Sequence, residues 1–397
     1  MKYIIIGNGV AGTTAALNIR KTDASGDITI LTDESYPFYS RIRLIEYLAD
    51  EIDEKKLTIY KDSWYEQNRI RLLLDTPVDS IERDLKEVVI ASGERLKYDR
   101  LLLALGGTSF VPPIPGSDKK GVFTLRTLKD AIDIKEYAKN ARKVLLIGGG
   151  VLGLEAGNSL RKSGHPLSIV EFFPRLLPRQ MDTEGAEILK AQMEDMGFTF
   201  YLNSKSKEIA GGDRVAGLLL EDGREIKCDM IIISAGIRPN ADLAEKSGLK
   251  LGKGLPVNDR METKIFDIYA AGDLIEHREL FYGIWPASEK QGEVAGINMA
   301  GGDTVYNGTT PSNVLKIAGV DLAAAGDIDA EGKFESIVKK DKEKYIYKKL
   351  VINGNRIIGC IFYGDSEGRK KVMKAIDEKR DISNIEKDLR QWNLEAL

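Results

Sequence analysis

Glycines in two parts of the chain are spaced in a way that suits phosphate binding. Residues 7–12 read G-N-G-V-A-G and residues 148–153 read G-G-G-V-L-G. In such a pattern the first glycine allows a tight turn, the second lets the backbone approach a pyrophosphate, and the third lets a helix and a strand pack closely. The N–H groups and partial positive charge of a following helix N-terminus would then favour the phosphates. The six glycines are Gly7, Gly9, Gly12, Gly148, Gly150 and Gly153.

Each glycine motif stands in the strand–helix–strand order that a dinucleotide-binding fold requires. The expected elements are residues 3–6, 13–20 and 28–31 around the first motif, and 144–147, 154–163 and 167–170 around the second. An acidic residue follows each second strand, namely Asp33 or Glu34 in the first unit and Glu171 in the second. One motif alone is a weak signal, but two in this context predict an α/β fold with two Rossmann-like domains. The economical pair of ligands is a tightly held FAD and a diffusing nicotinamide dinucleotide.

Composition excludes several other classes of protein. At about 150 residues per domain, 397 residues predict two or three domains. The 58 basic and 61 acidic side chains leave a net charge of −3, which argues against a nucleic-acid binder. Two distant cysteines cannot build a disulfide framework or a cysteine-rich metal site. The N-terminus does not resemble a signal peptide, and apolar runs such as 101–105 are too short to span a membrane. We expect a cytoplasmic protein with no nucleic-acid or membrane partner and no metal.

Further segments resemble, in the same order along the chain, those of the FAD-dependent pyridine nucleotide oxidoreductases with two dinucleotide-binding domains. Residues 98–107 are similar to the "YDxLLxATG" segment of that family, and residues 268–273 to its second FAD motif. The other matching segments are 112–116, 228–240 and 285–292. The resemblance implies cofactor-binding roles for Ala104, Gly106, Gly236, Gly272, Asp273, Trp285, Pro286 and Ala287.

This resemblance covers essentially the whole chain and implies three domains. They are a discontinuous FAD-binding domain (1–110 and 237–305), an inserted NAD-binding domain (111–236) and a small α+β C-terminal domain (306–397). Within the last, alternating patterns predict strands over 345–351 and 356–362, separated by an Asn-Gly-Asn turn signal. Helical patterns follow over 368–379 and 382–392.

The choice of nicotinamide dinucleotide depends on Glu171. A carboxylate accepts hydrogen bonds from ribose hydroxyls and repels a 2′-phosphate, so NADH is the expected substrate and NADPH the less favoured one. Arg175 and Arg179 lie just downstream. They either support NADPH binding or form a solvated face, and we favour the solvated face.

The electron acceptor is constrained by missing thiols. The disulfide reductases of the resembled superfamily need a redox cysteine pair, and one related branch uses a single cysteine, where this chain has Ile42. Isoleucine cannot form a thiolate. Cys228 and Cys360 are expected to be packing residues, and His165 and His277 to be surface or turn residues. FAD is therefore expected to be the last redox centre on the chain.

Two segments resemble the branch that reduces small electron-carrier proteins. Residues 37–44 are similar to the "PxYxRxxL" signature of rubredoxin reductases, ferredoxin reductases and assimilatory nitrite reductases, and residues 313–320 to an "LKxxGI" stretch. Glu46 stands where the ferredoxin-reductase branch has a lysine, which weakens the ferredoxin reading. The nitrite-reductase reading needs iron–sulfur and sirohaem domains, whose cysteines are missing. The short NADH:rubredoxin oxidoreductases match best overall.

The resemblance also implies roles near the flavin and the nicotinamide. Arg41 is a candidate FAD ligand, Arg43 and Lys316 are candidate cations at the flavin, and Glu155 is expected at the nicotinamide end. The predicted function is transfer of electrons from NADH through FAD to a small protein such as rubredoxin. The alternatives are an NADH oxidase that uses oxygen and a redox-responsive flavoprotein sensor. The oligomeric state, monomer or homodimer, is left open.

Overall fold

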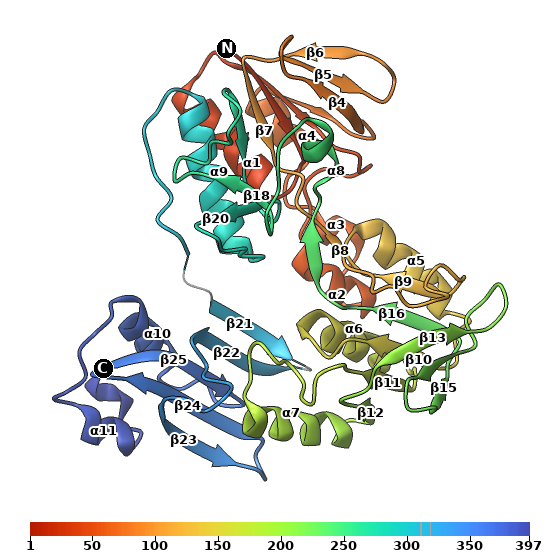
Figure 1. Ribbon diagram of the computed structural model, residues 1–397, viewed down its shortest axis with the longest axis vertical. Coiled ribbons are helices and arrows are strands. Elements are labelled where there is room, and N and C mark those ends of the chain that lie inside the picture. The colour runs from red at the N-terminus through yellow and green to blue at the C-terminus, as the bar shows by residue number, and fades with distance from the viewer. Residues whose placement is uncertain (310–311, 318) are drawn as a thin grey trace. The chain divides into compact units, whose positions relative to one another are not determined.

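The computed structural model describes residues 1–309, 312–317 and 319–397, including all side chains except those of 312–315 and 317. The chain divides into two compact units, each of which is assembled from separate segments (Figure 1). The first unit contains residues 1–44, 52–110 and 237–309. The second contains residues 45–51, 111–236 and 310–397.

The first unit is built around a five-stranded parallel sheet. Its strands, in spatial order, are β19 (Ile268–Ala270), β7 (Arg100–Leu103), β1 (Lys2–Ile6), β2 (Asp27–Leu31) and β3 (Ile70–Leu73). Residues 4–6 and 101–103 are buried, as expected for strands covered on both faces. The apolar run that begins the sequence therefore forms the centre of the sheet.

Two helices of the first unit, α1 (Val10–Thr22) and α9 (Trp285–Met299), pack closely enough for their backbones to touch. A Cβ added to Gly292 would lie 2.4 Å from the carbonyl oxygen of Ala11, and one added to Gly296 would lie 2.4 Å from that of Ala15. Glycine at i and i+4 on α9, facing alanine at i and i+4 on α1, allows this approach. It sets the position of the turn from which α1 begins.

Smaller elements complete the first unit. The strands are β4 (Val78–Glu82), β5 (Glu87–Ile90) and β6 (Arg95–Lys97) in one antiparallel sheet, β8 (Gly107–Ser109) paired with β17 (Ile237–Pro239), and β18 (Leu255–Val257) paired with β20 (Ile275–His277). The short helices are η1 (Arg41–Arg43), α3 (Glu54–Leu57), α4 (Asp62–Gln67) and α8 (Asp242–Lys246). Helix α2 (Leu44–Leu48) begins at the last residue of the first segment and continues into the second unit.

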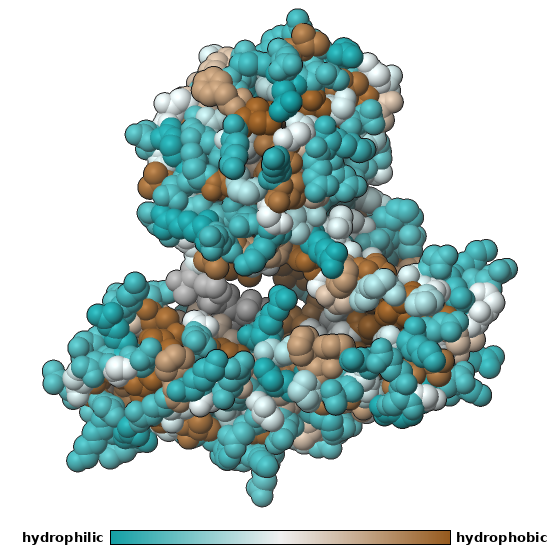
Figure 2. Space-filling view, viewed as in Figure 1, coloured by the Kyte–Doolittle hydropathy of each residue, from teal (hydrophilic) through white to brown (hydrophobic). Residues whose placement is uncertain are grey.

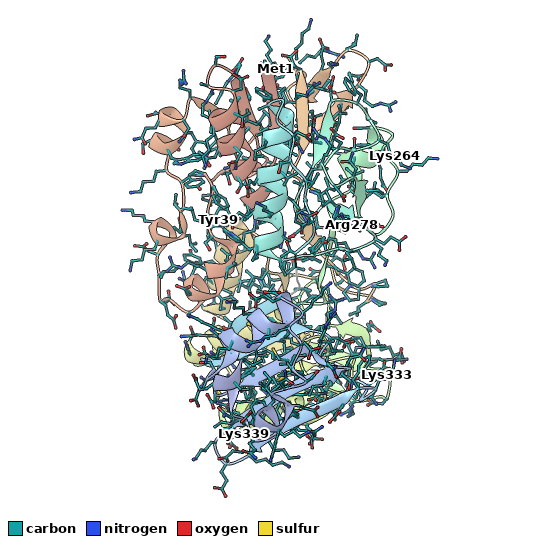
Figure 3. The ribbon with its side chains drawn as sticks, turned by 90° about the vertical axis from the view of Figure 1, so that its left-hand side faces the viewer. Met1, Tyr39, Lys264, Arg278, Lys333 and Lys339 are labelled. Carbon is teal, nitrogen blue, oxygen red and sulfur yellow. The ribbon has the colours of Figure 1, made fainter. Side chains whose placement is uncertain are left out.

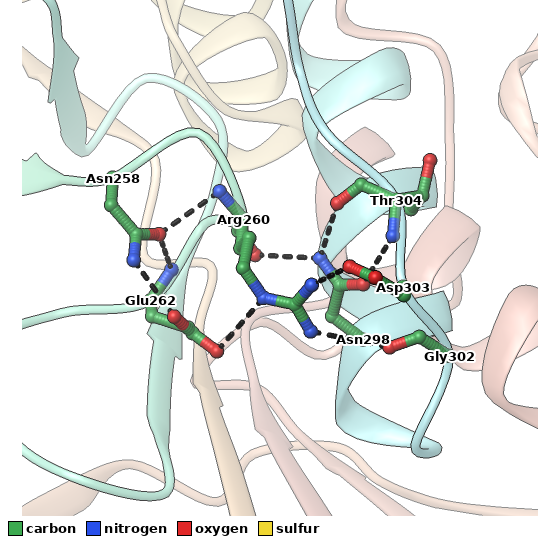
Figure 4. Close-up of polar contacts among 7 residues, drawn as sticks. All are labelled: Asn258, Arg260, Glu262, Asn298, Gly302, Asp303 and Thr304. Atoms are coloured by element: carbon green, nitrogen blue, oxygen red, sulfur yellow. Dashed lines mark hydrogen bonds and ion pairs between the residues drawn. The ribbon is translucent and has the colours of Figure 1, made fainter.

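A polar network holds the C-terminal end of α9, near the end of the last segment of the first unit (Figure 4). The Asn298 amide donates to the carbonyl oxygens of Arg260 (3.0 Å) and Thr304 (2.9 Å). The Arg260 guanidinium forms ion pairs with Asp303 and Glu262. Residues 302–304 are therefore fixed to the same unit as α9.

The second unit repeats the parallel sheet. The spatial order is β12 (Phe198–Tyr201), β11 (Leu167–Val170), β10 (Val144–Ile147), β16 (Met230–Ile233) and β9 (Val122–Thr124). Helices α5 (Leu128–Ala138), α6 (Val151–Lys162) and α7 (Thr183–Asp195) accompany it. A three-stranded antiparallel sheet of β13 (Ser206–Ala210), β14 (Gly217–Leu220) and β15 (Glu225–Lys227) adds buried residues to the same core.

The C-terminal segment forms an antiparallel sheet in the same unit. Its order is β21 (Ser312–Ile317), β22 (Val320–Gly326), β25 (Arg356–Tyr363), β24 (Ile346–Asn353) and β23 (Glu335–Asp341). Its core also contains side chains of α10 (Arg369–Asp377), α11 (Glu386–Arg390) and η2 (Leu394–Ala396). Helix α7 lies alongside this sheet and contacts β24 (Figure 1).

The expected fold class is confirmed, and the glycine motifs lie between the expected strands and helices. The last expected helix is shorter than the sequence pattern over 382–392, since α11 covers Glu386–Arg390. The division into three domains stays a prediction. Among the described residues no helix is long and apolar enough to cross a membrane. Hydrophilic residues predominate on the face of each unit that Figure 2 presents.

Candidate dinucleotide-binding sites

The first glycine turn joins β1 to α1 in a geometry that only glycine permits at two positions. Gly7 has φ +115°, and a Cβ there would lie 2.1 Å from the carbonyl oxygen of Ala104. A Cβ at Gly12 would lie 2.0 Å from the carbonyl oxygen of Gly7. Gly9 differs, because a Cβ there would meet no atom within 4 Å. The first and third glycines thus serve chain packing, and the second leaves open space at the N-terminus of α1 for a phosphate.

The acidic end of β2 is joined to the loop that follows it. The Glu34 carboxylate accepts a hydrogen bond from the Tyr39 hydroxyl (2.5 Å) and forms an ion pair with Arg41. Burial acts to lower the pKa of Arg41, but the nearby Tyr39, Glu34 and Asp273 outweigh it and raise that pKa. The structure therefore brings Asp273, from a distant part of the sequence, near Arg41 and its ion-pair partner Glu34. Tyr39 is labelled in Figure 3.

Two cavities adjoin this region of the first unit. The larger, about 200 Å³, is lined by residues that include Gly7, Asp33, Asn240 and Lys246. The smaller is lined by Asn8, Gly9, Glu34, Tyr36 and Arg41, among others. Asp33 and Glu34 thus line different cavities. The two candidates for the acidic residue that binds the FAD ribose are therefore separated in space.

A buried donor in the glycine turn supports FAD as the ligand of this site. The Asn8 side chain accepts a hydrogen bond from the Tyr65 hydroxyl (3.0 Å) through Oδ1. Its Nδ2 is buried and has no hydrogen-bond partner among the described residues. Buried donors are normally satisfied. An oxygen-rich dinucleotide at the turn would satisfy this one, so the residues present fit the cofactor.

The remaining FAD candidates occupy the ends of strands and the start of α9. Ala104 and Gly106 follow β7, and Gly106 has φ +66°. Gly272 (φ +85°) follows β19, and its N–H donates to Gln291 Oε1 on α9 (2.9 Å). Gly236 (φ +102°) follows β16 at the end of a segment of the second unit.

The predicted N-terminal residues of α9 are Trp285, Pro286 and Ala287, and the structure begins that helix at Trp285. The Trp285 ring lies 5.8 Å from the ring of Phe38, in the same loop as Tyr39. The Arg43 guanidinium donates a hydrogen bond to the carbonyl oxygen of Lys56 (2.9 Å). A flavin contact by Arg43 stays a prediction.

The second glycine turn, between β10 and α6, repeats the first. Gly148 has φ +117°, and a Cβ there would lie 2.2 Å from the carbonyl oxygen of Ser234. A Cβ at Gly153 would lie 2.3 Å from the carbonyl oxygen of Gly148, whereas one at Gly150 would meet no atom within 4 Å. The open position again lies where α6 begins, as a phosphate site requires.

Glu171 directly follows β11 and is almost completely buried, with 5% of its surface exposed. Its carboxylate accepts hydrogen bonds from the N–H groups of Gly149 (2.5 Å) and Phe173 (2.8 Å). Each carboxylate oxygen has a second lone pair. The side chain is thus fixed beside the glycine turn and keeps acceptor capacity for ribose hydroxyls.

The two arginines after Glu171 behave differently. Arg179 is exposed, as expected. Arg175 is not a simple solvated side chain, because its guanidinium donates to the carbonyl oxygens of Met181 (3.1 Å) and Pro178 (3.2 Å). The solvated-face interpretation is therefore wrong for Arg175. Its side chain is engaged in holding the loop between β11 and α7.

Glu155 and Lys316 both belong to the second unit. Glu155 lies on α6, two residues after Gly153, and is partly buried. Lys316 lies on β21 and is exposed. The side chains of 313–315 and 317, and residue 318 entirely, lie outside the described residues. The roles given to Glu155, Lys316 and the stretch 313–320 stay predictions.

The cysteines are packing residues, as expected. Cys228 and Cys360 are buried in separate hydrophobic cores, and burial raises the pKa of each thiol to about 12. The expectation for His277 was wrong. It is fully buried at the end of β20, and its ring lies 2.8 Å from Asp259 Oδ1. Charge and strand pattern gave no sign of that partner, which is 18 positions away.

Sequence reasoning did not assign functions to Asn8, Tyr39 and Tyr65. Asn8 stands between the first two glycines, and a polar residue at that position is the signal that could have identified it. Tyr39 and Tyr65 reach the site only through tertiary contacts. Among the described residues, no group of histidine, cysteine and acidic side chains could hold a metal ion.

Comparisons with known proteins agree with this geometry. Residues 1–292 match the pyridine nucleotide-disulphide oxidoreductase family, and residues 311–380 match the rubredoxin NAD+ reductase C-terminal domain. The chain belongs to the pyridine nucleotide-disulphide oxidoreductase family. The family and the relatives imply the cofactors expected from the sequence, FAD and NADH.

Individual relatives differ in length. The nitrite reductase [NAD(P)H] of Bacillus subtilis is 37% identical over 97% of this chain, which spans about half (48%) of that protein. The NADH-rubredoxin oxidoreductase of Clostridium acetobutylicum is 34% identical, over 97% of this chain and 96% of that protein. The crystal structure of the NADH:rubredoxin oxidoreductase from the same organism superposes with a TM-score of 0.84, at 32% identity, and covers 99% of each chain.

Proposed function

We propose that the protein oxidises NADH and delivers the electrons, one at a time, to a small redox protein of the rubredoxin type. The observation that carries this proposal is the absence of cysteine from the whole FAD-binding unit. Both cysteines, Cys228 and Cys360, belong to segments of the other unit. Their raised pKa leaves almost no thiolate at neutral pH. A thiol relay, which a disulfide reductase needs, has no residues in the FAD-binding unit to form it.

Ile42 strengthens this argument. It occupies the position at which one branch of the family has its single redox cysteine, and it is 64% exposed on η1. Its side chain cannot be oxidised reversibly, as a thiol can. Electrons must therefore leave without a protein thiol. The similarity to an NADH-rubredoxin oxidoreductase along nearly its full length supports a protein acceptor.

The two glycine turns would bind different dinucleotides. Gly7, Gly9, Asn8 and Arg41 would hold FAD, which when bound supplies the exchange between two-electron hydride transfer and one-electron transfer. Glu171 and the turn at 148–153 would bind NADH, and Glu171 would disfavour a 2′-phosphate. No residue needs to act as an acid or base, because positioning supplies most of the catalysis. A cytoplasmic location and a monomeric or homodimeric state stay predictions.

Anaerobic stopped-flow absorbance tests the proposal. The holoenzyme is reduced with one equivalent of NADH and then mixed with air-saturated buffer or with oxidised rubredoxin. Fast reoxidation by rubredoxin and slow reoxidation by oxygen are expected. Fast reoxidation by oxygen, with no further gain from rubredoxin, would establish an NADH oxidase instead. Failure of both acceptors would favour the redox-responsive sensor.

A further inference from the structure

The loop between β11 and α7, residues 171–182, is attached directly to the second glycine turn. The N–H of Leu177 donates to the carbonyl oxygen of Gly149 (3.0 Å), and the N–H of Gly149 donates to the Glu171 carboxylate. Leu177 and Met181 are fully buried, and the Arg175 guanidinium bridges two carbonyl groups of the loop. The loop and the glycine turn therefore form one continuous hydrogen-bonded surface at the carboxyl end of the sheet.

The far end of this loop is fixed by the C-terminal sheet. Asp182 caps α7 through Oδ1, which accepts from the N–H of Gly185 (3.0 Å). Its Oδ2 accepts from the Tyr347 hydroxyl (2.6 Å) and from Lys349 Nζ (3.0 Å), both on β24. Lys349 Nζ also donates to the carbonyl oxygen of Asp329 (3.0 Å).

All three side chains of this cluster are withdrawn from solvent. Asp182 is 9% exposed, Lys349 5% and Tyr347 0%. A buried ion pair gains little net stability over apolar side chains of the same size, because desolvation costs nearly as much as the attraction returns. The ion pair instead contributes specificity of position, because a carboxylate that accepts hydrogen bonds from three fixed donors can adopt only one arrangement. The cluster therefore fixes where Asp182, and hence the loop, lies relative to the sheet.

The neighbouring lysine supplies an internal comparison. Lys348 is as buried as Lys349, at 3% exposed, and forms an ion pair with Asp365 (2.5 Å). Successive residues of a strand point to opposite faces. Lys348 accordingly lies over the rings of Phe362 and Trp392, within the C-terminal segment itself. Two adjacent buried lysines thus have the same chemistry, but only Lys349 reaches the loop.

We propose that Lys349 and Tyr347 are positioning residues for the nicotinamide dinucleotide. By holding Asp182 they fix residues 171–182 against the glycine turn, and the C-terminal sheet thereby sets the affinity for the dinucleotide. This inference rests on the proposed function in one respect, that the dinucleotide binds at 148–153. Coupling is reciprocal, so dinucleotide binding also strengthens the hold of α7 on β24.

Calorimetric titration of the oxidised, full-length holoenzyme with NAD+ tests the inference without turnover. Lys349→Met should raise the Kd about 10-fold, within the usual range of coupling between sites. Tyr347→Phe, which removes one hydrogen bond and leaves the ring, should raise it about 5-fold. Lys348→Met is the matched control, and its Kd should stay within about twofold of the wild type, because the Lys348 side chain lies on the opposite face of β24 and does not reach the loop.

Stability is separated from positioning by a double variant. Lys349→Met leaves the Asp182 carboxylate buried without its cation, which lowers the melting temperature. Adding Asp182→Asn removes that charge and keeps a residue able to cap α7. The double variant should recover melting temperature and still bind NAD+ weakly. In turnover with ferricyanide, the KM for NADH should rise in Lys349→Met while kcat stays near the wild-type value.

Two results would overturn this inference alone, and a third would also overturn the assignment of the dinucleotide site. Wild-type affinity in both Lys349→Met and Tyr347→Phe would make the cluster merely structural. An equal loss in Lys348→Met would assign the effect to general destabilisation. If the wild-type holoenzyme itself bound no NAD+, the dinucleotide assignment would fail, and the positioning role would fail with it.

Discussion

The two dinucleotide-binding folds of this chain share a scaffold and differ in the loop after the second strand. Both sheets have the same order, with β1, β2 and β3 matching β10, β11 and β12. Both glycine turns use tight first and third positions and an open second position. In the first fold, however, the acidic residue is bound by side chains of its own loop. In the second it is bound by backbone N–H groups, and its loop continues to the C-terminal sheet.

We propose that this difference lets one scaffold serve two kinds of ligand. Glu34 lies in a cluster with Tyr39, Arg41 and Asp273, and such a charge-rich surround suits a resident cofactor with many polar atoms. Glu171 is buried against the backbone, and the loop that it begins is held by Asp182 from a separate sheet. Because this loop is held by a second sheet, binding of a diffusing substrate beside the loop can be coupled to the position of that sheet. The sheet positions the glycine turn, and the loop after the second strand determines which ligand the fold suits.

The largest effect is expected where the two folds agree most closely. Gly12→Ala and Gly153→Ala each place a methyl group about 2 Å from a backbone carbonyl oxygen. Such overpacking against backbone should cost about 3 kcal/mol of stability. Thermal unfolding followed by circular dichroism should show a marked loss for both variants. Wild-type melting in either would mean that the third glycine is not needed for packing.

The second glycines should separate the two ligands. Gly9→Ala and Gly150→Ala add a methyl group in open space, so the free energy of unfolding of the FAD-free protein should change by about 0.5 kcal/mol or less. Gly9→Ala should nevertheless purify with little FAD. Gly150→Ala should retain FAD and bind NAD+ at least about tenfold more weakly. Loss of FAD from Gly150→Ala would contradict the assignment of the two turns.

A smaller effect is expected at the two acidic residues. Glu171→Gln keeps the shape and one acceptor oxygen but removes the negative charge. The preference for NADH over NADPH should therefore fall about 10-fold, as steady-state kcat/KM with each dinucleotide would show. Glu34→Gln is the matched control in the other fold, and it should leave that preference unchanged. An unchanged preference in Glu171→Gln would place dinucleotide discrimination elsewhere.

The smallest effect is expected at the cysteines, which neither fold uses for chemistry. Their pKa values are raised to about 12, so both thiols stay protonated at about pH 8 and thiolate appears only as the pH approaches the raised value. Iodoacetamide should label the native protein very slowly at that pH. Cys228→Ser and Cys360→Ala should leave electron transfer to rubredoxin unchanged. A slower acceptor reaction in either variant would restore a thiol pathway.

Much of the fold and part of the site followed from local sequence. Spacing alone located both glycine turns, because the packing of strand, turn and helix depends on residues that are adjacent in the chain. It also located Glu171 and the strands β10 and β11, whose bounds agree with the pattern. The same reasoning failed for Arg175 and His277. Arg175 binds a backbone carbonyl oxygen and His277 binds a carboxylate, and only folding brings these partners near.

By itself, the sequence determined that the chain has two glycine motifs with the spacing of a dinucleotide-binding turn, and it excluded a thiol from residues 1–110 and 237–305, since residue types and short spacings are independent of packing. The tertiary structure alone decided which side chains meet. It joined Glu34 to Arg41, left Nδ2 of Asn8 buried without a hydrogen-bond partner among the described residues, and directed Lys349 rather than Lys348 to Asp182. Adjacent residues of identical type differ here because a strand turns them to opposite faces.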